Sequence, residues 1–314
     1  MRAYCNLVIG ILLCTFLCGC SNQHLYKETR VMMGTFIEVT SPSCEALKIA
    51  FDELKRVEDL LSKYNPESEV AKLNKFGNIK ASPETFYLIK RAVDFCRMSG
   101  GAFDITVGPL MDLWGFTDKH YRLPQEEEIR KALKLVGSDK IILHDFNNVV
   151  EFKTRGVKID LGGIAKGYAL DCAVNKLKAS GVPSCLLNAG GQVRALGYKF
   201  CQPWAIAVKN PQSAGIAEKI ALFPDESCAT SGDYEQYFIK EGRRYAHILD
   251  PRTGYPANSG IASVTVVASD GLTADALSTA IFVLGKEKGL ALVEMSFPGA
   301  RLKIIEEKDV YRNK

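Results

Sequence analysis

The sequence has little of what marks several large classes of protein. Its net charge is only +4 over 314 residues, and no stretch forms the basic stripe of a nucleic-acid-binding protein, so nucleic acid is not an expected partner. No internal repeat or low-complexity segment stands out. With 47% hydrophobic and 24% charged residues, the chain has the composition of a globular protein with ample material for a core.

Cysteine pairs with metal-ligand spacing are also missing from the main part of the chain. The cysteines beyond the N-terminal segment lie far apart, with no C-x-x-C pair and no Cys/His cluster, which argues against a structural zinc site. They are Cys44, Cys96, Cys172, Cys185, Cys201 and Cys228. We expect them to be small buried apolar side chains, and the sequence leaves their disulfide pairing open.

The N-terminus lacks an apolar run long enough to span a membrane comfortably. The run Leu7–Leu17 suits the hydrophobic region of a signal peptide instead. Because Cys20 then follows in a segment that resembles a bacterial lipobox, we expect a signal peptide over 1–19, a lipidated Cys20, a linker over 20–28 and a folded domain over 29–314. An ordinary secretory signal with incidental cysteines remains the alternative.

Hydrophobic periodicity predicts helices mixed with antiparallel hairpins. Helices are expected over 44–63, 67–75, 83–99, 124–136, 273–284 and 286–295. Strands are expected over 29–40, 141–145, 149–153, 184–188, 204–209, 217–223, 236–240, 244–249, 262–268 and 300–305. This mixture favours an α+β fold over a doubly wound parallel sheet.

The stretch 159–171 carries the most information about function. An apolar β-run holding Asp160 breaks at two glycines and opens a helix, expected to continue to about residue 180, whose first turn holds Lys166. Free backbone N–H groups and the positive end of the helix dipole make such a junction a ready anion site. The spacing does not match G-x-G-x-x-G, and Lys166 is followed by Gly167 rather than by the Ser or Thr of a phosphate loop. A ligand at this junction is therefore held neither by a dinucleotide-binding fingerprint nor by a phosphate loop.

Asp275 and Thr279 form a candidate cation site at the start of an apolar helix. They are four residues apart, so they share one helix face, and both offer the hard oxygen ligands that magnesium prefers. The alternative is structural: Asp275 complements the helix dipole and Thr279 bonds back to a carbonyl.

Three further side chains are candidates for chemistry or binding. His247 ends a strand that leads into a Pro-Gly turn, where a neutral imidazole can take a proton from an attacking hydroxyl; the alternative is a turn cap. Asp104 and Asp160 are acids within apolar runs, and a buried carboxylate needs a partner. That partner is either a ligand or another group of the protein.

Taken together, the motifs resemble those of the ApbE family of FAD:protein FMN transferases. They follow one another in order over residues 31–285. The matching segments are Met33-Gly34-Thr35, Leu61-Ser62-x-Tyr64, Gly101-x-Phe103-Asp104-Ile105-Thr106-x-Gly108-Pro109-Leu110, Ile159-Asp160-Leu161-Gly162-Gly163-Ile164-Ala165-Lys166-Gly167, Asn188-x-Gly190-Gly191, Ser231-Gly232-Asp233-Tyr234, His247-x-x-Asp250-Pro251-x-Thr253-Gly254 and Thr273-x-Asp275-x-x-x-Thr279.

The resemblance implies a fold and a set of site residues. The fold is ApbE-like and T-fold-related, an α+β arrangement of mixed sheets and packed helices with an FAD cleft between two lobes. Mg²⁺ would be held by the Gly163 carbonyl, Asp275 and Thr279. His247 would be the catalytic base, and His247 or Ile248 would lie near the isoalloxazine or the reacting phosphate. The other flavin nucleotide contacts would be Met33, Tyr64, Ala102, Phe103, Asp104, Asp160 and Lys166.

The same resemblance implies an activity and a location. The enzyme would move the FMN half of FAD onto a Thr or Ser hydroxyl of a target flavoprotein and release AMP. The usual recipients are subunits of Rnf and sodium-translocating NADH:quinone reductase complexes. The protein would be a bacterial cell-membrane lipoprotein facing the periplasm. Two alternatives stay open: an FAD pyrophosphatase that gives FMN and AMP, and a non-catalytic lipoprotein that stores or delivers FAD.

Overall fold

The computed structural model describes residues 24–211, 213 and 215–307. The expected signal peptide and Cys20 lie outside the described residues. The helices within these limits are α1 (Cys44–Leu61), α2 (Glu69–Phe76), α3 (Pro83–Met98), α4 (Gly108–Trp114), α5 (Glu126–Leu133), α6 (Ala165–Ala179), α7 (Gly271–Leu284) and α8 (Lys286–Ser296), with 3₁₀ turns at Ile105–Val107 and Ser138–Lys140. None of the helices in this described part is long and apolar enough to cross a bilayer.

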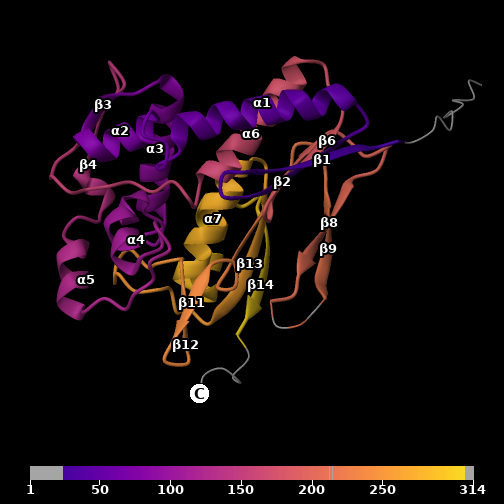
Figure 1. The fold of residues 1–314 in the computed structure, drawn as a ribbon. Coiled ribbons are helices and arrows are strands. Elements are labelled where there is room, and N and C mark those ends of the chain that lie inside the picture. Colours follow the sequence, from indigo (N-terminus) through magenta and orange to yellow (C-terminus); the bar gives the residue numbers. More distant parts are fainter. Residues whose placement is uncertain (1–23, 212, 214, 308–314) are drawn as a thin grey trace, which may run out of the picture.

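A seven-stranded antiparallel sheet forms the centre of the molecule, in the order β1-β2-β6-β7-β10-β13-β14 (Figure 1). Its strands are β1 (Tyr26–Met32), β2 (Thr35–Ser41), β6 (Cys185–Ala189), β7 (Gln192–Leu196), β10 (Ser227–Gly232), β13 (Ile261–Ala268) and β14 (Arg301–Glu306). Every neighbouring pair is antiparallel, which confirms the predicted α+β class and excludes a doubly wound sheet.

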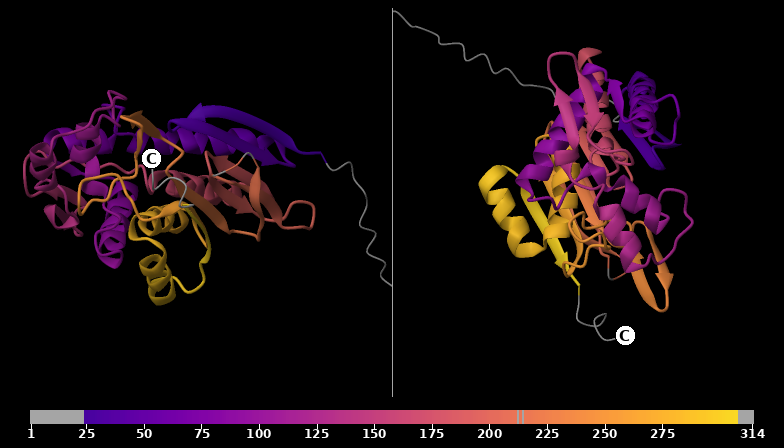
Figure 2. Two further views of the ribbon diagram at one scale, coloured as in Figure 1. Left: turned by 90° about the horizontal axis from the view of Figure 1, so that it is seen from below. Right: turned by 90° about the vertical axis from the view of Figure 1, so that its left-hand side faces the viewer.

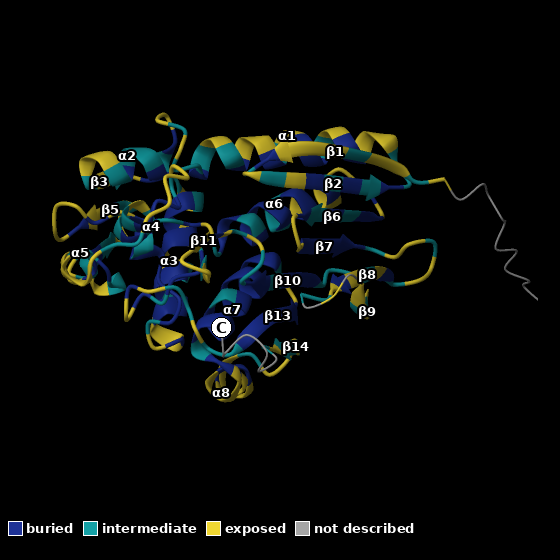
Figure 3. Cartoon of the chain, turned by 60° about the horizontal axis from the view of Figure 1, so that its bottom comes forward, coloured by how far each residue is buried: buried dark blue, intermediate teal, exposed yellow. Residues whose placement is uncertain are grey.

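Both faces of this sheet are covered at its centre. Helices α1, α6 and α7 bury their apolar sides against one face and against each other in the main hydrophobic core (Figure 3). On the other face, the hairpin β8 (Trp204–Lys209) and β9 (Ile216–Leu222) packs Trp204 and Leu222 against Val267 of β13. All eight residues of β13 are therefore buried, and its sequence is a nearly unbroken apolar run rather than an alternating one.

The helices α2 to α5 form a second part of the molecule beside the sheet (Figure 2). It includes the small sheet β3 (Asn78–Lys80), β5 (Val149–Phe152) and β4 (Ile141–His144), and the hairpin β11 (Tyr237–Lys240) and β12 (Arg243–Ala246) packs on it. Helices α4 and α5 and this hairpin share a separate core, in which Trp114 of α4 contacts Phe238 and Tyr245. The buried side chains of α2, α3 and the small sheet belong to the main core, so the second lobe expected from the resemblance is joined to the sheet by a continuous core.

The first predicted strand, 29–40, is wrong in one respect. The chain reverses at Met33 and Gly34, whose positive φ angles of 51° and 73° make a tight turn between β1 and β2. The apolar alternation continues on both sides of the turn, so periodicity alone shows no break. The turn brings Met33 to the edge of the cleft.

The expected β-run at Val157–Leu161 is also wrong, because it pairs with no strand. The side chain of Asn74 takes the place of a neighbouring strand: its Oδ1 accepts from Ile159 N at 2.7 Å and its Nδ2 donates to Ile159 O at 2.9 Å. Asp160 N donates to the Ile105 carbonyl at 2.7 Å. The segment is extended and buried, as its composition predicts, but an asparagine and a 3₁₀ turn satisfy its backbone.

Three strands and one α-helix were not predicted, and one expectation for the cysteines fails. Strands β3, β7 and β10 and helix α4 lie in stretches for which no element was predicted. The Gly, Ser, Thr and Pro residues of β10 and α4 resemble turn residues. All six cysteines of the described residues are free; Cys96, Cys185 and Cys228 are buried, but Cys44 and Cys201 are exposed, so the expectation of burial is wrong for these two.

Candidate functional site

A cavity of about 920 Å³ lies between the two lobes, a size typical of small-molecule sites. Loops and element ends from both lobes line it. The lining includes every side chain or backbone position that the sequence singled out, and the set is Met33, Tyr64, Ala102, Phe103, Asp104, Asp160, Gly163, Lys166, His247, Ile248, Asp275 and Thr279. These residues span 247 positions of the chain, so the fold brings together groups that are remote in sequence.

Asp275 is the most buried acid of this cavity, with 2% of its surface exposed. Its Oδ2 accepts from the backbone N of Gly167 at 2.9 Å, and its Oδ1 accepts from Nε2 of Gln192 at 2.6 Å. The Gly167 N–H belongs to the first turn of α6, where no intrahelical partner exists. The predicted anion site at this junction is therefore partly filled by a carboxylate of the protein itself. Burial raises the pKa of Asp275, and the nearby Lys166 opposes the rise.

The structural alternative for Asp275 and Thr279 is confirmed only for Thr279. The N–H groups that open α7 are capped by Asp270, which accepts from Thr273 N, and by Asp171, which accepts from Gly271 N and Leu272 N. Asp275 is therefore not used to cap its own helix. The Thr279 hydroxyl does bond back to the Asp275 carbonyl, at 3.2 Å.

Gly163 lies directly beside Thr279. A Cβ at Gly163 would meet Thr279 Oγ1 at 3.1 Å and the Phe103 ring at 3.2 Å. The backbone of Gly163, the Thr279 hydroxyl and the Asp275 carboxylate thus line one end of the cavity with oxygen donors. Within the described residues, no three His, Cys, Asp or Glu side chains form a metal cluster. The expected ligand set holds a single carboxylate, so it does not depend on such a cluster.

Asp160 forms an ion pair that the sequence did not predict. Lys63 Nζ lies 2.7 Å from Asp160 Oδ2, and the two side chains are only 14% and 12% exposed. Lys63 Nζ also donates to Thr117 Oγ1 at 3.1 Å, and Asp160 Oδ1 accepts from Gly162 N at 2.8 Å. Burial opposes ionisation of Asp160, but Lys63 and the Gly162 N–H together hold the pKa of this carboxyl below its usual value.

Asp104 faces the same cavity but finds its partners within the protein. Its carboxylate accepts from the N and Oγ1 of Thr106 at 2.8 and 2.7 Å, and from Ser138 N at 2.9 Å. It also accepts from Cys96 Sγ at 3.3 Å. The partners of Asp104 are therefore other groups of the protein, as one of the two sequence-based alternatives expected. Its carboxylate holds the 3₁₀ turn Ile105–Val107, which follows Phe103, in place.

His247 follows directly after β12, at the strand end predicted for it. Its Nδ1 lies 3.0 Å from the Gln236 carbonyl, which has no hydrogen to give, so Nδ1 is the donor and carries the proton. Nε2 is then left with its lone pair. Burial and the positive charge of Lys166 lower the pKa of His247 to about 4, so the ring is neutral at pH 7.

The rest of the lining divides into an apolar wall and a polar rim. Ala102, Phe103 and Ile248 are at most 8% exposed and form the wall. Tyr64 is 66% exposed at the rim. Lys166 Nζ donates to the Gly162 carbonyl at 3.1 Å, beside the start of α6. A flat apolar wall next to a cationic helix start suits a ligand with both a ring system and phosphates.

Lys63 and Gln192 are two of the lining residues that sequence reasoning missed. Lys63 occupies the variable position of the Leu61-Ser62-x-Tyr64 motif, and Gln192 directly follows the Gly190-Gly191 turn. Gln192 starts β7, so recognising that strand would have shown that Gln192 lies beside the turn rather than in a loop. Nothing in the sequence pairs Lys63 with Asp160, which is 97 residues away.

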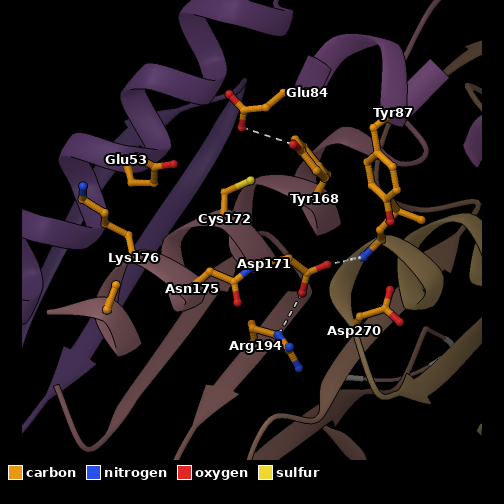
Figure 4. A pocket seen from close by; sticks show the side chains of 12 residues that line it. Glu53, Glu84, Tyr87, Tyr168, Asp171, Cys172, Asn175, Lys176, Arg194 and Asp270 are labelled. Atoms are coloured by element: carbon orange, nitrogen blue, oxygen red, sulfur yellow. Dashed lines mark hydrogen bonds and ion pairs between the residues drawn. The ribbon is translucent and has the colours of Figure 1, made fainter. Parts of the chain in front are cut away.

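A second cavity, of about 700 Å³, is lined by residues of α6, β7 and the start of α7, among others (Figure 4). Asp171 of α6 points at Arg194 of β7, with 2.9 Å between Oδ1 and Nε, and its two oxygens also accept from Gly271 N and Leu272 N. Glu84 accepts from the Tyr168 hydroxyl at 3.2 Å and pairs with Arg56. Among the lining residues, Asp171 and Arg194 pair with each other, and Glu53 and Glu84 pair with Arg56.

Known proteins resemble this chain over most of its length. The model of the ApbE family matches residues 33–302. Relatives named FAD:protein FMN transferase include one from Klebsiella pneumoniae, 34% identical with 86% of each chain covered, and one from Treponema pallidum, 33% identical with 93% of this chain and 88% of the relative covered.

Solved structures give the same result for the fold. The ApbE protein of Thermotoga maritima superposes with a TM-score of 0.84 at 41% identity, over 90% of this chain and 94% of the other. The flavin transferase ApbE of Vibrio cholerae gives a TM-score of 0.81 at 29% identity, over 91% and 94%.

Proposed function

The chain belongs to the ApbE family, and from this premise we propose that it transfers the FMN half of FAD to a Thr or Ser hydroxyl of a target flavoprotein, releasing AMP. One observation carries the proposal: every flavin, metal and catalytic position expected from the resemblance lines one cavity, and Asp275, Thr279 and Gly163 offer oxygen donors there. A ring-binding wall, a cationic helix start and a neutral imidazole share that cavity.

The donor set fits Mg²⁺. A buried carboxylate, a hydroxyl and a backbone carbonyl are hard oxygen ligands, and magnesium commonly takes few protein ligands and completes its coordination with water and phosphate oxygens. When bound, Mg²⁺ neutralises charge on the pyrophosphate and on the departing AMP. Asp275 is the only charged member of the set, so it contributes most to cation affinity.

His247 acts as the general base. The target hydroxyl must lose its proton as its oxygen attacks the FMN phosphorus and the bond to AMP breaks. Because Nδ1–H is engaged by the Gln236 carbonyl, Nε2 is the atom that accepts this proton. The low pKa keeps the ring unprotonated at neutral pH, so the base is available without prior deprotonation.

Two lysines hold charge in the site. Lys166, beside the start of α6, neutralises a phosphate oxygen of FAD. Lys63 keeps Asp160 ionised in a poorly solvated position, and Asp160 is then a fixed hydrogen-bond acceptor for the nucleotide. Phe103 and Ile248 supply the apolar surface for the flavin rings, and Met33, Tyr64 and Ala102 extend it.

Mass measurement of an acceptor protein tests the proposal. The purified chain is incubated with FAD, Mg²⁺ and a candidate flavoprotein domain, and the expected product is the acceptor with one FMN joined through a phosphoester, together with one AMP per acceptor. An acceptor whose Thr or Ser is replaced by Val or Ala is the control and stays unmodified. Candidate acceptors are subunits of Rnf and sodium-translocating NADH:quinone reductase complexes.

The same incubation separates the competing activities. A pyrophosphatase releases free FMN at the same rate with and without the acceptor. A storage protein leaves FAD intact for hours with Mg²⁺ present. Either result would remove the transferase assignment.

The proposal includes a lipid anchor at Cys20. The supporting observation is the lipobox-like segment after an apolar run of signal-peptide length. Lipidation would hold the domain at the periplasmic face of the bacterial cell membrane. Expression of the full chain is expected to give a protein in the membrane fraction, and Cys20→Ala is expected to move it to the soluble fraction. A Cys20→Ala chain that stays in the membrane fraction contradicts the anchor.

A further inference from the structure

The turn between β1 and β2 holds a residue that its backbone does not favour. Met32 pairs with Thr35, so Met33 and Gly34 are the two central residues, and their φ angles are 51° and 73°. Two-residue turns with two positive φ angles strongly favour Asn-Gly, Asp-Gly or Gly-Gly, since most side chains are strained in this region. Met33 is such a strained residue, and strain of this kind gathers at functional sites.

The Met33 side chain has a use that explains its presence in the turn. It lines the main cavity, and it is half-buried where it packs against the main core. A methionine offers a flexible, polarisable apolar surface to a ligand, which neither glycine nor asparagine provides. The turn therefore keeps a residue that suits the cavity in place of one that suits the backbone.

Glu58 of α1 holds this turn from across the fold. Its Oε1 accepts from the backbone N of Met33 at 2.6 Å, although the two residues are 25 positions apart. This is the only hydrogen bond that the Glu58 side chain makes within the described residues. Glu58 also lines the main cavity, so the bond lies at the wall where Met33 meets a ligand. A bond from an N–H to a carboxylate is about twice as strong as one to a neutral oxygen, so it can hold a strained turn.

We propose that Glu58 is a positioning residue for FAD: its carboxylate binds the Met33 N–H and so holds the turn in the conformation that presents the Met33 side chain to the ligand. This rests on the proposed function, which places FAD in the main cavity. Without Glu58 the strained turn relaxes into other conformations. The apparent dissociation constant for FAD then rises in inverse proportion to the fraction of molecules whose turn is competent.

FAD affinity, measured by flavin fluorescence without an acceptor protein, tests the proposal. Glu58→Met keeps the length and the helix propensity of the side chain but removes both oxygens. We expect the dissociation constant to rise about 10-fold, as for a turn that is competent about a tenth of the time. Glu294→Met makes the same change at an exposed residue of α8 and should match the wild type.

The conservative variant Glu58→Gln separates the hydrogen bond from the charge. Its amide oxygen can still accept from Met33 N, so we expect FAD affinity to stay within about 3-fold of the wild type. A loss as large as that of Glu58→Met would show that the negative charge matters and not the bond to the turn, and it would overturn the proposal.

A double-mutant cycle separates an indirect role from a direct contact. Met33→Ala removes the side chain that the turn presents, and it should weaken FAD binding at least as much as Glu58→Met. If Glu58 acts through Met33, adding Glu58→Met to Met33→Ala changes FAD affinity little further. Losses that add would make Glu58 a direct FAD contact, and unchanged affinity in Met33→Ala would leave nothing to position. Either result overturns the proposal.

Two further measurements distinguish positioning from a purely structural role. In Glu58→Met the KM for FAD should rise while kcat at saturating FAD stays near the wild-type value, because bound FAD selects the competent turn. Without FAD, hydrogen–deuterium exchange at Met33 N should be faster in Glu58→Met than in Glu294→Met. The melting temperature should fall by no more than about 4 °C, the effect of one lost hydrogen bond.

The outcomes also separate this inference from the proposed function. A lower melting temperature with unchanged FAD affinity, or unchanged exchange at Met33 N, overturns the role of Glu58 alone. A wild type that binds no FAD overturns the proposed function and with it the role of the turn.

Discussion

The main cavity and the second cavity are both lined by residues of α6 and α7, and they differ in how the charges of those residues are paired. In each, an aspartate of one helix accepts from the first-turn N–H groups of the other: Asp275 of α7 accepts from Gly167 N, and Asp171 of α6 accepts from Gly271 N and Leu272 N. Burial raises the pKa of both acids. The two helices thus cap each other.

The difference lies in the remaining polar groups. Around Asp171, Arg194 supplies the opposite charge at 2.9 Å, although its buried Nε makes no well-formed hydrogen bond. Asp275 lies instead near the half-buried Lys166, which opposes the rise in its pKa, and the His247 Nε2 keeps its lone pair. A satisfied cluster stabilises the fold, whereas groups left with unused bonding capacity are suited to bind and transform a ligand.

This comparison also explains the glycines at the helix crossing. A Cβ at Gly167 would lie 2.0 Å from the Gly271 carbonyl oxygen, and one at Gly271 would lie 2.3 Å from the Gly167 carbonyl oxygen. Only two glycines allow the backbones this close. The close approach is what lets each aspartate reach the other helix. Gly167, in the stretch 159–171, therefore serves helix packing rather than phosphate binding.

The largest expected effect is in the active cavity. Asp275→Ala removes the only charged oxygen donor of the proposed cation site, and we expect Mg²⁺-dependent FMN transfer to fall by at least ~10³-fold. The measurement is the mass of the acceptor protein over time at saturating FAD. If the variant transfers FMN at the wild-type rate, Asp275 is not part of a cation site, and the main cavity is not distinguished from the second cavity by its role in catalysis.

His247→Ala is expected to lower the transfer rate by about 10²–10⁴-fold through loss of the general base. FAD affinity, measured by flavin fluorescence, should change little, because the apolar wall and the lysines remain. A collapse of FAD binding together with activity would instead make His247 a binding residue.

Asp171→Ala should act on stability and not on chemistry. It leaves Arg194, only 7% exposed, without its anion, and it uncaps α7, so we expect a loss of about 3–5 kcal/mol in the free energy of unfolding. Denaturant unfolding measures the loss, and transfer per folded molecule should stay near the wild-type rate. A large loss of turnover in fully folded protein would show that the second cavity shares the function.

Lys63→Met is expected to reverse a pH dependence. In the wild type, the pKa of Asp160 is lowered, so this pair contributes stability above the unfolded pKa and loses it as the pH falls. Without Lys63, burial raises the pKa of Asp160 above its unfolded value, and stability is then lost as the pH rises, by about 3 kcal/mol. Unfolding between pH 3 and 8 tests this reversal, with Asp160→Asn/Lys63→Met as the pH-independent control at this site.

The smallest effect concerns acid pH in the wild type. Since the pKa of His247 lies at about 4, the ring is neutral above that value and takes a proton below it. We expect kcat/KM for transfer to be independent of His247 protonation between pH 6 and 8 and to fall about tenfold per pH unit once the pH drops below 4. Loss of activity already near the ordinary histidine pKa of about 6.5 would show that the ring is not held neutral.

The fold could be predicted where local pattern and packing agree. Helices α1, α3 and α7 follow from apolar spacing and, for α3, from Ser82 and Pro83 at its start. Strand β10 could not be recognised, because the partners of its buried hydroxyls lie far along the chain: Ser227 donates to Val193 O of β7, and Ser231 lies 2.9 Å from Ser278 of α7. The turn at Met33 and Gly34 escaped notice for a similar reason, since only the pairing of β1 with β2 distinguishes it from a continuous strand.

The sequence by itself named the residues expected to bind and react in the folded domain, and the structure places all of them around the main cavity. The tertiary structure alone decided how their charges are balanced: that Lys63 pairs with Asp160, that Asp104 is satisfied by Thr106 and Ser138, and that Gln192 donates to Asp275. The physical reason is that a motif fixes residue types along the chain, whereas hydrogen bonds and ion pairs depend on which groups meet across it, and in a buried site those partners set what remains free to react.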